Sequence, residues 1–452
     1  MADEFRCPQC AAGALDVAPD AAQWRCVACA QVFPVLQGVP WLVPQPLQHL
    51  QEWRQRYLLL IRREEQIERA LRERLQDPTL SRLAWARLGR LADGHASHRR
   101  NLHALLAPLQ LLSATAGPVL EGLQTRLPLS QDLTSYYVNL HRDWVWGDGE
   151  NRAALAIVRD FVDSEPLGRL LVPGAGAGRL AYDLHQELAP AATVALDINP
   201  LLVWSLKRLA DGATLNLVEF PLAPRTTDDV AVPRELRAPA AARKGFSVLL
   251  GDLLHAPFAP GSFDTVVTPW LIDILPESLP RLAQRVAQLL RPGGRWINFG
   301  SLAFGLADPA QHLTAAEIGP LLGANGFAVE RERDDPLPYM RSPASRHARM
   351  EQVYSFVARR GATAPELWPL ESQSDWARDP RVPVPPSAFL AEQALKQQVY
   401  GFVAALVDGQ RSTADIAAHL ADKRLMSLEE ALPAVRGFLL QLHEQAGQRR
   451  RW

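Results

Sequence analysis

A glycine-rich turn between an apolar segment and a helical segment constrains this chain more than any other feature. The apolar run 168–173 leads into Gly174, Gly176 and Gly178, and a helical pattern follows. Glycine lets the backbone approach a ligand closely, and this order is typical of nucleotide-binding α/β domains. Asp197 ends the next apolar run, nineteen residues after Gly178, where a carboxylate can accept hydrogen bonds from both ribose hydroxyls.

Later segments decide between the ligands that such a turn can hold. Alone, the turn fits a dinucleotide site equally well, or a tight turn in an α/β domain without a ligand. A strand pattern ends at Gly251 and Asp252, another covers 263–268, and a helical pattern over 279–290 runs into an Arg-Pro-Gly-Gly turn and a strand. Pro and Gly end the helix and turn the chain. This order resembles class I methyltransferases and favours S-adenosylmethionine (SAM) over a nicotinamide cofactor.

All four cysteines lie within the first 29 residues, as Cys7-x-x-Cys10 and Cys26-x-x-Cys29 separated by fifteen residues. Two such knuckles suit tetrahedral Zn²⁺, and a segment this small needs the metal to fold. A redox pair or four unrelated cysteines are the alternatives. Because protein thiols fill all four positions, we expect a structural zinc site rather than a catalytic one.

The predicted fold is α/β: a Rossmann-like class I SAM-dependent methyltransferase core with an N-terminal zinc ribbon and flanking helical regions. We expect a ribbon at 1–44, a helical region at 45–130, the methyltransferase domain at 131–360, a linker at 361–385 and a C-terminal helical module at 386–452. The net charge of −1 does not favour a nucleic-acid partner. With no apolar run of 18 residues and no signal peptide at the N-terminus, we expect a cytoplasmic protein without a membrane partner.

The segment after the second cysteine pair, with Phe33-Pro34 and Gly38-Val39-Pro40, resembles the zinc ribbon of the small activator subunit shared by several tRNA and protein methyltransferases. The resemblance covers about 40 residues and implies that the ribbon packs on the chain's own methyltransferase domain.

The core, over roughly residues 134–360, resembles the carnosine N-methyltransferase family. The matching motifs are His141-Arg142-Asp143-Trp144, the VPGAGAGRLAYDL loop, Gly251-Asp252-Leu253, TPWLID at 268–273 and WINFGSL at 296–302. The resemblance implies SAM contacts from Asn139 and Arg142, from Gly174, Gly176 and Gly178, from Asp197 to the ribose, and from Asp252 and Leu253 around adenine. It also implies that Asp273 and Tyr339 face the methyl acceptor.

Two departures from the family pattern fall on the acceptor side. Where the family carries a His that helps hold its substrate, this chain has the run 303–306, Ala-Phe-Gly-Leu, and a second family Tyr is replaced near Glu351. Both changes leave the expected SAM contacts intact. We therefore predict SAM-dependent methyl transfer, with an imidazole- or amine-containing small molecule or peptide as the acceptor.

Asp273 is the predicted catalytic residue, because a carboxylate can orient an imidazole or take up the proton of a nitrogen nucleophile. A helix N-cap near 274–276 is the structural alternative for this residue. Two other functions stay open: a methyltransferase for a protein, peptide or RNA guided by the flanking domains, and a non-catalytic SAM-binding scaffold. The C-terminal stretch DGQRSTADIA resembles PqqD-like or winged-helix modules, and serves either packing or peptide recognition.

Overall fold

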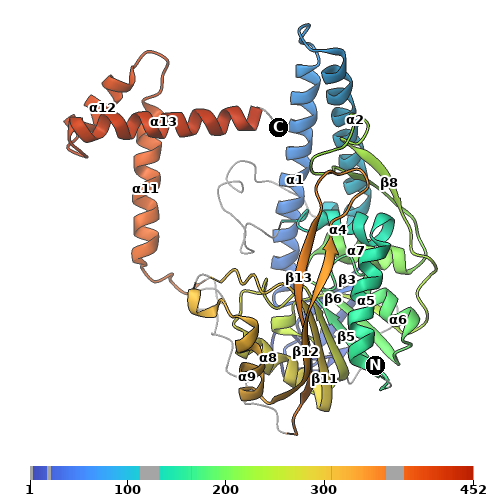
Figure 1. The fold of residues 1–452 in the computed structure, drawn as a ribbon. Helices are drawn as coiled ribbons and strands as arrows, with labels where there is room; N and C mark the ends of the chain where they lie inside the picture. Colours follow the sequence, from blue (N-terminus) through green and yellow to red (C-terminus); the bar gives the residue numbers. More distant parts are fainter. Residues whose placement is uncertain are drawn as a thin grey trace. The chain divides into compact units, whose positions relative to one another are not determined.

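The computed structural model describes residues 4–17, 22–111, 132–163, 165–306, 308–362 and 381–450. It divides into two compact units, Met1–Leu367 and Trp368–Trp452 (Figure 1). The predicted linker at 361–385 lies mostly outside the described residues, as does the end of the predicted helical region after residue 111. The predicted division into five segments therefore stays a prediction.

A doubly wound sheet forms the centre of the first unit. Its strands are β5 (Arg169–Pro173), β6 (Ala192–Asp197), β9 (Phe246–Gly251), β10 (Phe263–Pro269), β11 (Leu290–Gly300), β12 (Phe327–Tyr339) and β13 (Arg349–Arg360). They lie in the order β9-β6-β5-β10-β11-β13-β12, parallel from β9 to β11 and antiparallel at β13 and β12. The predicted α/β, Rossmann-like fold class is confirmed.

Helices cover both faces of this sheet, because its parallel strands are apolar on both sides. They are α5 (Asp148–Val162), α6 (Arg179–Glu187), α7 (Pro200–Ala210), α8 (Leu279–Leu289) and α9 (Ala315–Ala324). Helix α8 begins after Ser278, has Pro at its first turn and buries Leu282 and Val286 at helical spacing. A hairpin of β7 (Leu215–Glu219) and β8 (Val232–Leu236) forms a separate two-stranded sheet.

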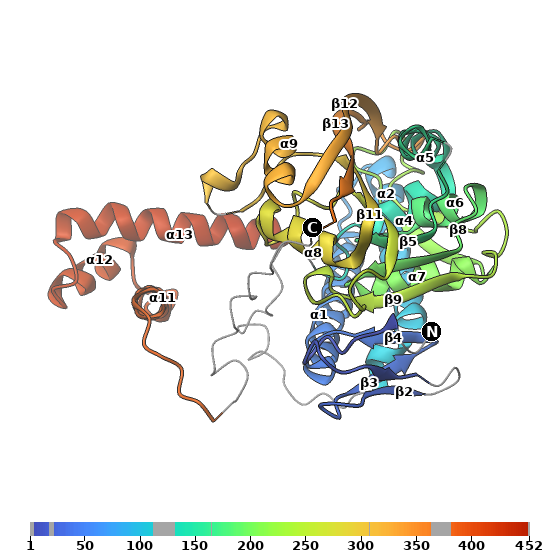
Figure 2. The same ribbon diagram turned by 90° about the horizontal axis from the view of Figure 1, so that it is seen from below.

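The cysteine-bearing segment continues the central sheet. Its strands β1 (Leu15–Asp16), β2 (Gln23–Cys26) and β3 (Val32–Leu36) are antiparallel neighbours, and β4 (Val39–Leu42) then pairs in parallel with β9. Figure 2 shows these strands stacked beyond β9. Phe33, Trp41 and Leu42 are fully buried, so that this small segment shares its apolar core with the large domain.

Two long helices, α1 (Pro46–Arg74) and α2 (Arg82–Leu105), form a hairpin against the central domain. The inner end of the hairpin is buried through the side chains of Trp53, Tyr57 and Leu102. Toward the outer end, α1 has no buried residue after Glu64. The 3-10 turn Ala107–Leu111 follows α2, and the short helix α4 (Tyr137–His141) continues as a π-helical turn, Arg142–Trp146. None of the described helices is both long and apolar enough to cross a membrane.

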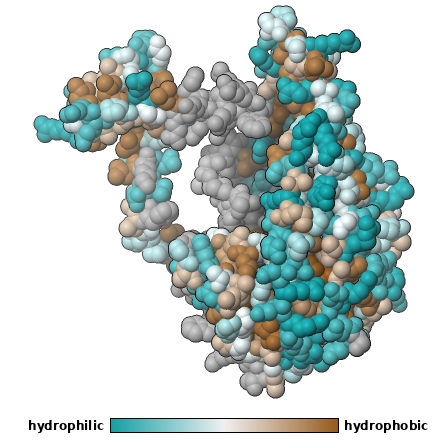
Figure 3. All heavy atoms as spheres, in the orientation of Figure 1, coloured by the Kyte–Doolittle hydropathy of each residue, from teal (hydrophilic) through white to brown (hydrophobic). Residues whose placement is uncertain are grey.

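The second unit has three helices and no strand in its described part, 381–450: α11 (Ala388–Ala405), α12 (Thr413–Asp422) and α13 (Leu428–Arg450). Ser412 caps α12 through a capping box with Asp415. A small core around Val403, Ile416 and Val435 joins the helices. Apolar side chains remain exposed on this unit, as the brown spheres over α12 and α13 show (Figure 3).

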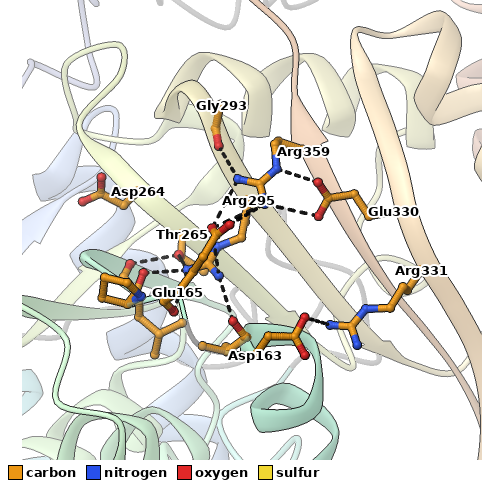
Figure 4. A network of polar contacts seen from close by, with 12 residues as sticks. Asp163, Glu165, Asp264, Thr265, Gly293, Arg295, Glu330, Arg331 and Arg359 are labelled. Carbon is orange, nitrogen blue, oxygen red and sulfur yellow. Dashed lines mark hydrogen bonds and ion pairs between the residues drawn. The ribbon is translucent and has the colours of Figure 1, made fainter.

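Arg295 fixes the sheet edge at which β10 and β11 begin (Figure 4). Its side chain is almost fully buried and donates hydrogen bonds to the carbonyls of Val162 (3.3 Å) and Pro166 (2.6 Å). Glu165 forms ion pairs with Arg295 and with Arg359. These contacts hold the turn between α5 and β5 against β11, on the edge opposite to the glycine-rich turn.

We expect Arg295→Ala to lower the free energy of unfolding of the first unit by roughly 3 kcal/mol, because it removes a buried guanidinium together with its hydrogen bonds to the carbonyls of Val162 and Pro166. Urea denaturation followed by tryptophan fluorescence measures the loss. Arg331→Ala is the matched control: its ion pair with Asp163 is exposed and should contribute less than about 1 kcal/mol. Equal effects of the two substitutions would contradict this account of the network.

Candidate active site

The predicted site residues on the central sheet lie at one edge, where the parallel strands end. The glycine-rich turn follows β5, Asp197 ends β6, Asp252 follows β9 and Asp273 lies shortly after β10. These four strands are neighbours in the sheet. Ligands of open α/β sheets bind at the carboxyl ends of the strands, where the strand order reverses. Here that reversal lies between β5 and β10.

The three glycine positions of the turn differ in the space that a side chain would have. All three have left-handed backbones, with φ of 60° at Gly174, 58° at Gly176 and 85° at Gly178. A Cβ would lie 2.5 Å from Leu271 at Gly174 and 2.4 Å from Leu206 at Gly178, but at Gly176 it would meet nothing within less than 4.0 Å. Gly174 and Gly178 therefore allow close packing, while Gly176 leaves open space beside the turn.

Asp197 links the glycine-rich turn to the end of β6. Its Oδ2 accepts a hydrogen bond from the Gly176 amide (2.8 Å) and its Oδ1 accepts one from the Asn199 amide (2.9 Å). Burial raises the pKa of this carboxyl. Each carboxylate oxygen can accept more than one hydrogen bond, so Asp197 retains acceptor capacity for a ligand.

The segment before the central domain is bound directly to the turn. Trp144 donates its indole N–H to the carbonyl of Ala177 (2.8 Å), and Arg179 donates to the carbonyl of Asp143 (2.8 Å). Asp143 pairs with Arg142 through two contacts of 2.7 Å. The predicted cofactor contact Arg142 is thus held beside the glycine-rich turn by residues on both sides of it.

Tyr339 is fixed at the end of β12 by a buried carboxylate. Glu150, which is 7% exposed, accepts hydrogen bonds from the backbone amides of Met340 (3.1 Å) and Arg341 (2.9 Å). The Tyr339 ring lies 4.9 Å from the ring of Trp270, and the Arg142 guanidinium lies 5.5 Å from its centre. The structure therefore brings Tyr339 together with Arg142.

Asp273 lies in a turn, not at the start of a helix. Residues 274–276 are not helical, and α8 begins at Leu279 with Ser278 before it. The Asp273 carboxylate instead accepts a hydrogen bond from the Ala303 amide (3.2 Å), in the loop after β11. Asp273 is 5% exposed, and this burial raises its pKa. The helix N-cap alternative for this residue is wrong.

Two aromatic residues near the site, Trp270 and Tyr136, have no role predicted from the sequence. Trp270, next to the end of β10, has a left-handed backbone (φ 52°). This conformation is rare for a bulky residue, and such backbone strain is found mostly at functional sites. Tyr136, just before α4, has the same conformation (φ 64°). The pKa of its hydroxyl is raised by partial burial and then by the charges of Tyr339, Asp273 and Asp197. No residue pattern signals either conformation.

Asp252 and Leu253 lie at the end of β9. The Asp252 carboxylate accepts a hydrogen bond from the Leu254 amide (2.9 Å) and contacts Nδ1 of His255 at 2.8 Å. The Asp252 carboxylate and the His255 ring are thus partners. Leu253 is buried and begins a 3-10 turn, Leu253–His255.

The four cysteines form a separate cluster in the ribbon. Their Sγ atoms all lie within 4.8 Å of one another, with 3.6 Å between Cys7 and Cys29 and 3.7 Å between Cys10 and Cys26. A tetrahedral zinc with bonds of about 2.3 Å separates its sulfurs by about 3.8 Å. The cluster has the dimensions of a four-thiolate metal site.

Comparison with known proteins agrees with the sequence resemblance. Residues 221–361 match the family model of carnosine N-methyltransferase. The chain is 25% identical over 215 residues to carnosine N-methyltransferase unmet of Drosophila melanogaster, covering 42% of this chain and 45% of the relative. It is 29% identical over 189 residues to nocamycin O-methyltransferase of Saccharothrix syringae, covering 38% and 57%. The chain thus spans about half the length of these curated relatives.

Two solved structures have a low overall likeness to this chain. A putative sarcosine dimethylglycine methyltransferase from Galdieria sulphuraria has a TM-score of 0.35 and 12% identity, with 51% of this chain and 99% of that chain covered. A chain in the complex between the Haloferax volcanii Trm112 methyltransferase activator and the putative methyltransferase has a TM-score of 0.34 and 14% identity, covering 51% and 98%.

The predicted resemblance to the carnosine N-methyltransferase family is confirmed over residues 221–361. This range contains Asp252, Leu253, Asp273 and Tyr339, whereas the glycine-rich turn, Asp197 and Arg142 precede it. The predicted enzyme class, a methyltransferase, agrees with the names of both curated relatives. One is named an N-methyltransferase and the other an O-methyltransferase.

Proposed function

We propose that this chain is a SAM-dependent N-methyltransferase whose acceptor is an imidazole- or amine-containing small molecule or peptide. The observation that carries the proposal is the hydrogen bond between the Gly176 amide and the Asp197 carboxylate. This contact supports a ribose-binding role for Asp197, beside an open glycine position at the carboxyl ends of the parallel strands. We assign Asp273 and Tyr339, which lie near the same edge of the sheet, to the binding of the methyl acceptor.

The residues at this edge fit SAM. The Oδ1 atom of Asn139 is buried and has no hydrogen-bond partner among the described residues, and such atoms in native proteins usually meet a ligand or water. We assign the cofactor contacts to Asn139, Arg142, Gly174, Gly176, Gly178, Asp197, Asp252 and Leu253. When bound, SAM supplies an electrophilic methyl group on a sulfonium.

Asp273 has the properties that the acceptor side requires. An imidazole nitrogen is a nucleophile only when it is neutral, and a carboxylate bound to the opposite N–H orients it. The pKa of Asp273 is raised by burial, which brings this carboxyl closer to holding a proton released by the acceptor. The rings of Trp270 and Tyr339 would exclude water from the reacting nitrogen.

Asp273→Asn should lower methyl transfer about 100-fold, because general-base and orienting contributions are of this size, and should change SAM affinity less than twofold. Transfer from labelled SAM to imidazole compounds and to a size-fractionated extract of the source cells measures the first value, and calorimetry the second. Asp211→Asn, an exposed carboxylate outside the site, is the control. Unchanged turnover would remove Asp273 from the mechanism, and label confined to peptide or RNA would favour a macromolecular acceptor.

We further propose that Cys7, Cys10, Cys26 and Cys29 hold one structural Zn²⁺. The two short Sγ–Sγ distances support this assignment. Because β4 is the last strand of the ribbon and pairs with β9, the metal would stabilise the attachment of the ribbon to its own methyltransferase domain. Four thiolate ligands fit a reducing compartment such as the cytoplasm.

Zinc removal should loosen the pairing of β4 with β9. The purified chain should release about one Zn²⁺ after thiol modification, and Cys26→Ser should retain little. Hydrogen exchange should then quicken at Trp41 and Leu42, while Leu170 and Leu171 in β5 serve as internal controls. A chain that binds no zinc, or exchange that the metal does not change, would contradict this role.

A further inference from the structure

A histidine contacts Asp252 on the cofactor side of the site. His255 ends the 3-10 turn that follows β9, three residues after Asp252. Its Nδ1 lies 2.8 Å from Oδ2 of Asp252, and each of the two side chains is 23% exposed. The pair is therefore packed against the protein and still open to a ligand on one side.

The sheet register places Asp252 next to the proposed ribose contact. Asp197, at the end of β6, is paired with Leu250 of β9, and Asp252 follows Leu250 by two residues. With the ribose on Asp197, the base extends away from the glycine-rich turn after β5. The next strand end in that direction is the end of β9, because β6 lies between β5 and β9.

Both oxygens of the Asp252 carboxylate have a partner within the turn. Oδ1 accepts a hydrogen bond from the Leu254 amide (2.9 Å), and Oδ2 contacts the His255 ring. An ionised carboxylate only accepts, so the ring donates from Nδ1. Each oxygen can accept a further hydrogen bond, and the carboxylate is therefore held without being saturated.

The two partners of Asp252 constrain it differently. The Leu254 amide belongs to the backbone and stays in place whichever side chain is present at residue 255. By itself it fixes one oxygen, and the last side-chain torsion of an aspartate is soft. The His255 ring fixes the second oxygen and with it the plane of the carboxylate.

Helix α8, which packs against this turn, brings a positive charge near Asp252. The Arg285 side chain is 11% exposed and lies 4.0 Å from Glu277. Burial lowers the pKa of Arg285, and the charges of Glu277 and Asp252 oppose this effect. An ionised carboxylate in this place has no hydrogen to donate, so it favours a ligand group that donates one.

We propose that His255 is a positioning residue of the cofactor site, which holds the Asp252 carboxylate in the orientation that accepts a hydrogen bond from the 6-amino group of adenine. The inference rests on the proposed function and adds a residue outside the Gly251-Asp252-Leu253 motif. His255 acts through Asp252 and does not itself touch the cofactor.

Two ligands that differ only in the amino group test this role. S-adenosylhomocysteine and its 6-deamino analogue, in which a hydrogen replaces the amino group, are titrated calorimetrically into the full chain. We expect S-adenosylhomocysteine to bind at least about tenfold more tightly, the size of a hydrogen bond to a charged group. His255→Leu should reduce this preference to about threefold or less by weakening S-adenosylhomocysteine alone.

A conservative variant separates positioning from a general loss of structure. The side-chain amide of His255→Asn can still donate to Asp252, so this variant should regain a preference of about fivefold or more. His419→Leu, at an exposed position of α12, is the control and should keep the full preference. A merely structural role of His255 would weaken both ligands equally in His255→Leu.

Equal weakening of both ligands, a preference that survives His255→Leu, or one that His255→Asn does not restore would overturn the proposal. Equal affinities of the two ligands in the unchanged chain would overturn it as well. If S-adenosylhomocysteine does not bind the unchanged chain, the proposed function fails together with this inference. If it binds and the preference does not depend on His255, the proposed function stands and the positioning role alone fails.

Discussion

The hydrogen bond from the Gly176 amide to the Asp197 carboxylate is the contact on which the site depends. It joins the turn after β5 to the end of β6 at a distance of 2.8 Å, and Gly176 itself has a left-handed backbone, which glycine adopts without steric cost. Trp144 then binds the carbonyl of Ala177 in the same turn. A change of shape at this turn would therefore affect both the proposed cofactor contacts of the central sheet and the segment that carries Arg142.

The acceptor side is built differently, from residues that are fixed by neighbours outside the sheet. Glu150 in α5 orders the backbone beyond Tyr339, and the loop after β11 donates the Ala303 amide to Asp273. On the central sheet the proposed cofactor contacts thus lie at strand ends, whereas Asp273, proposed to face the methyl acceptor, lies in a turn. This arrangement agrees with the sequence, in which the two departures from the family pattern, at 303–306 and at Glu351, fall on loop and strand-end positions of the acceptor side.

The sequence predicts the strand ends well, because glycines and carboxylates after apolar runs are visible without a structure. It places Gly174, Gly176, Gly178 and Asp197 in order, and the strand topology confirms the fold class. The sequence does not show that Tyr136 and Trp270 have left-handed backbones, since tertiary contacts impose these conformations. It also leaves the helix N-cap open for Asp273, because the carboxylate's partner, Ala303, is thirty residues away in the chain. The pairing of β4 with β9 is equally a long-range contact.

The most direct test of the central claim is the equilibrium binding of SAM and of NAD⁺ to the full chain and to Asp197→Ala. The account predicts that SAM binds the unchanged chain, that NAD⁺ binds far more weakly, and that the substitution weakens SAM binding by tenfold or more, since it removes a charged acceptor from the ribose. Failure of SAM to bind, preference for NAD⁺, or unchanged SAM affinity in Asp197→Ala would contradict the account.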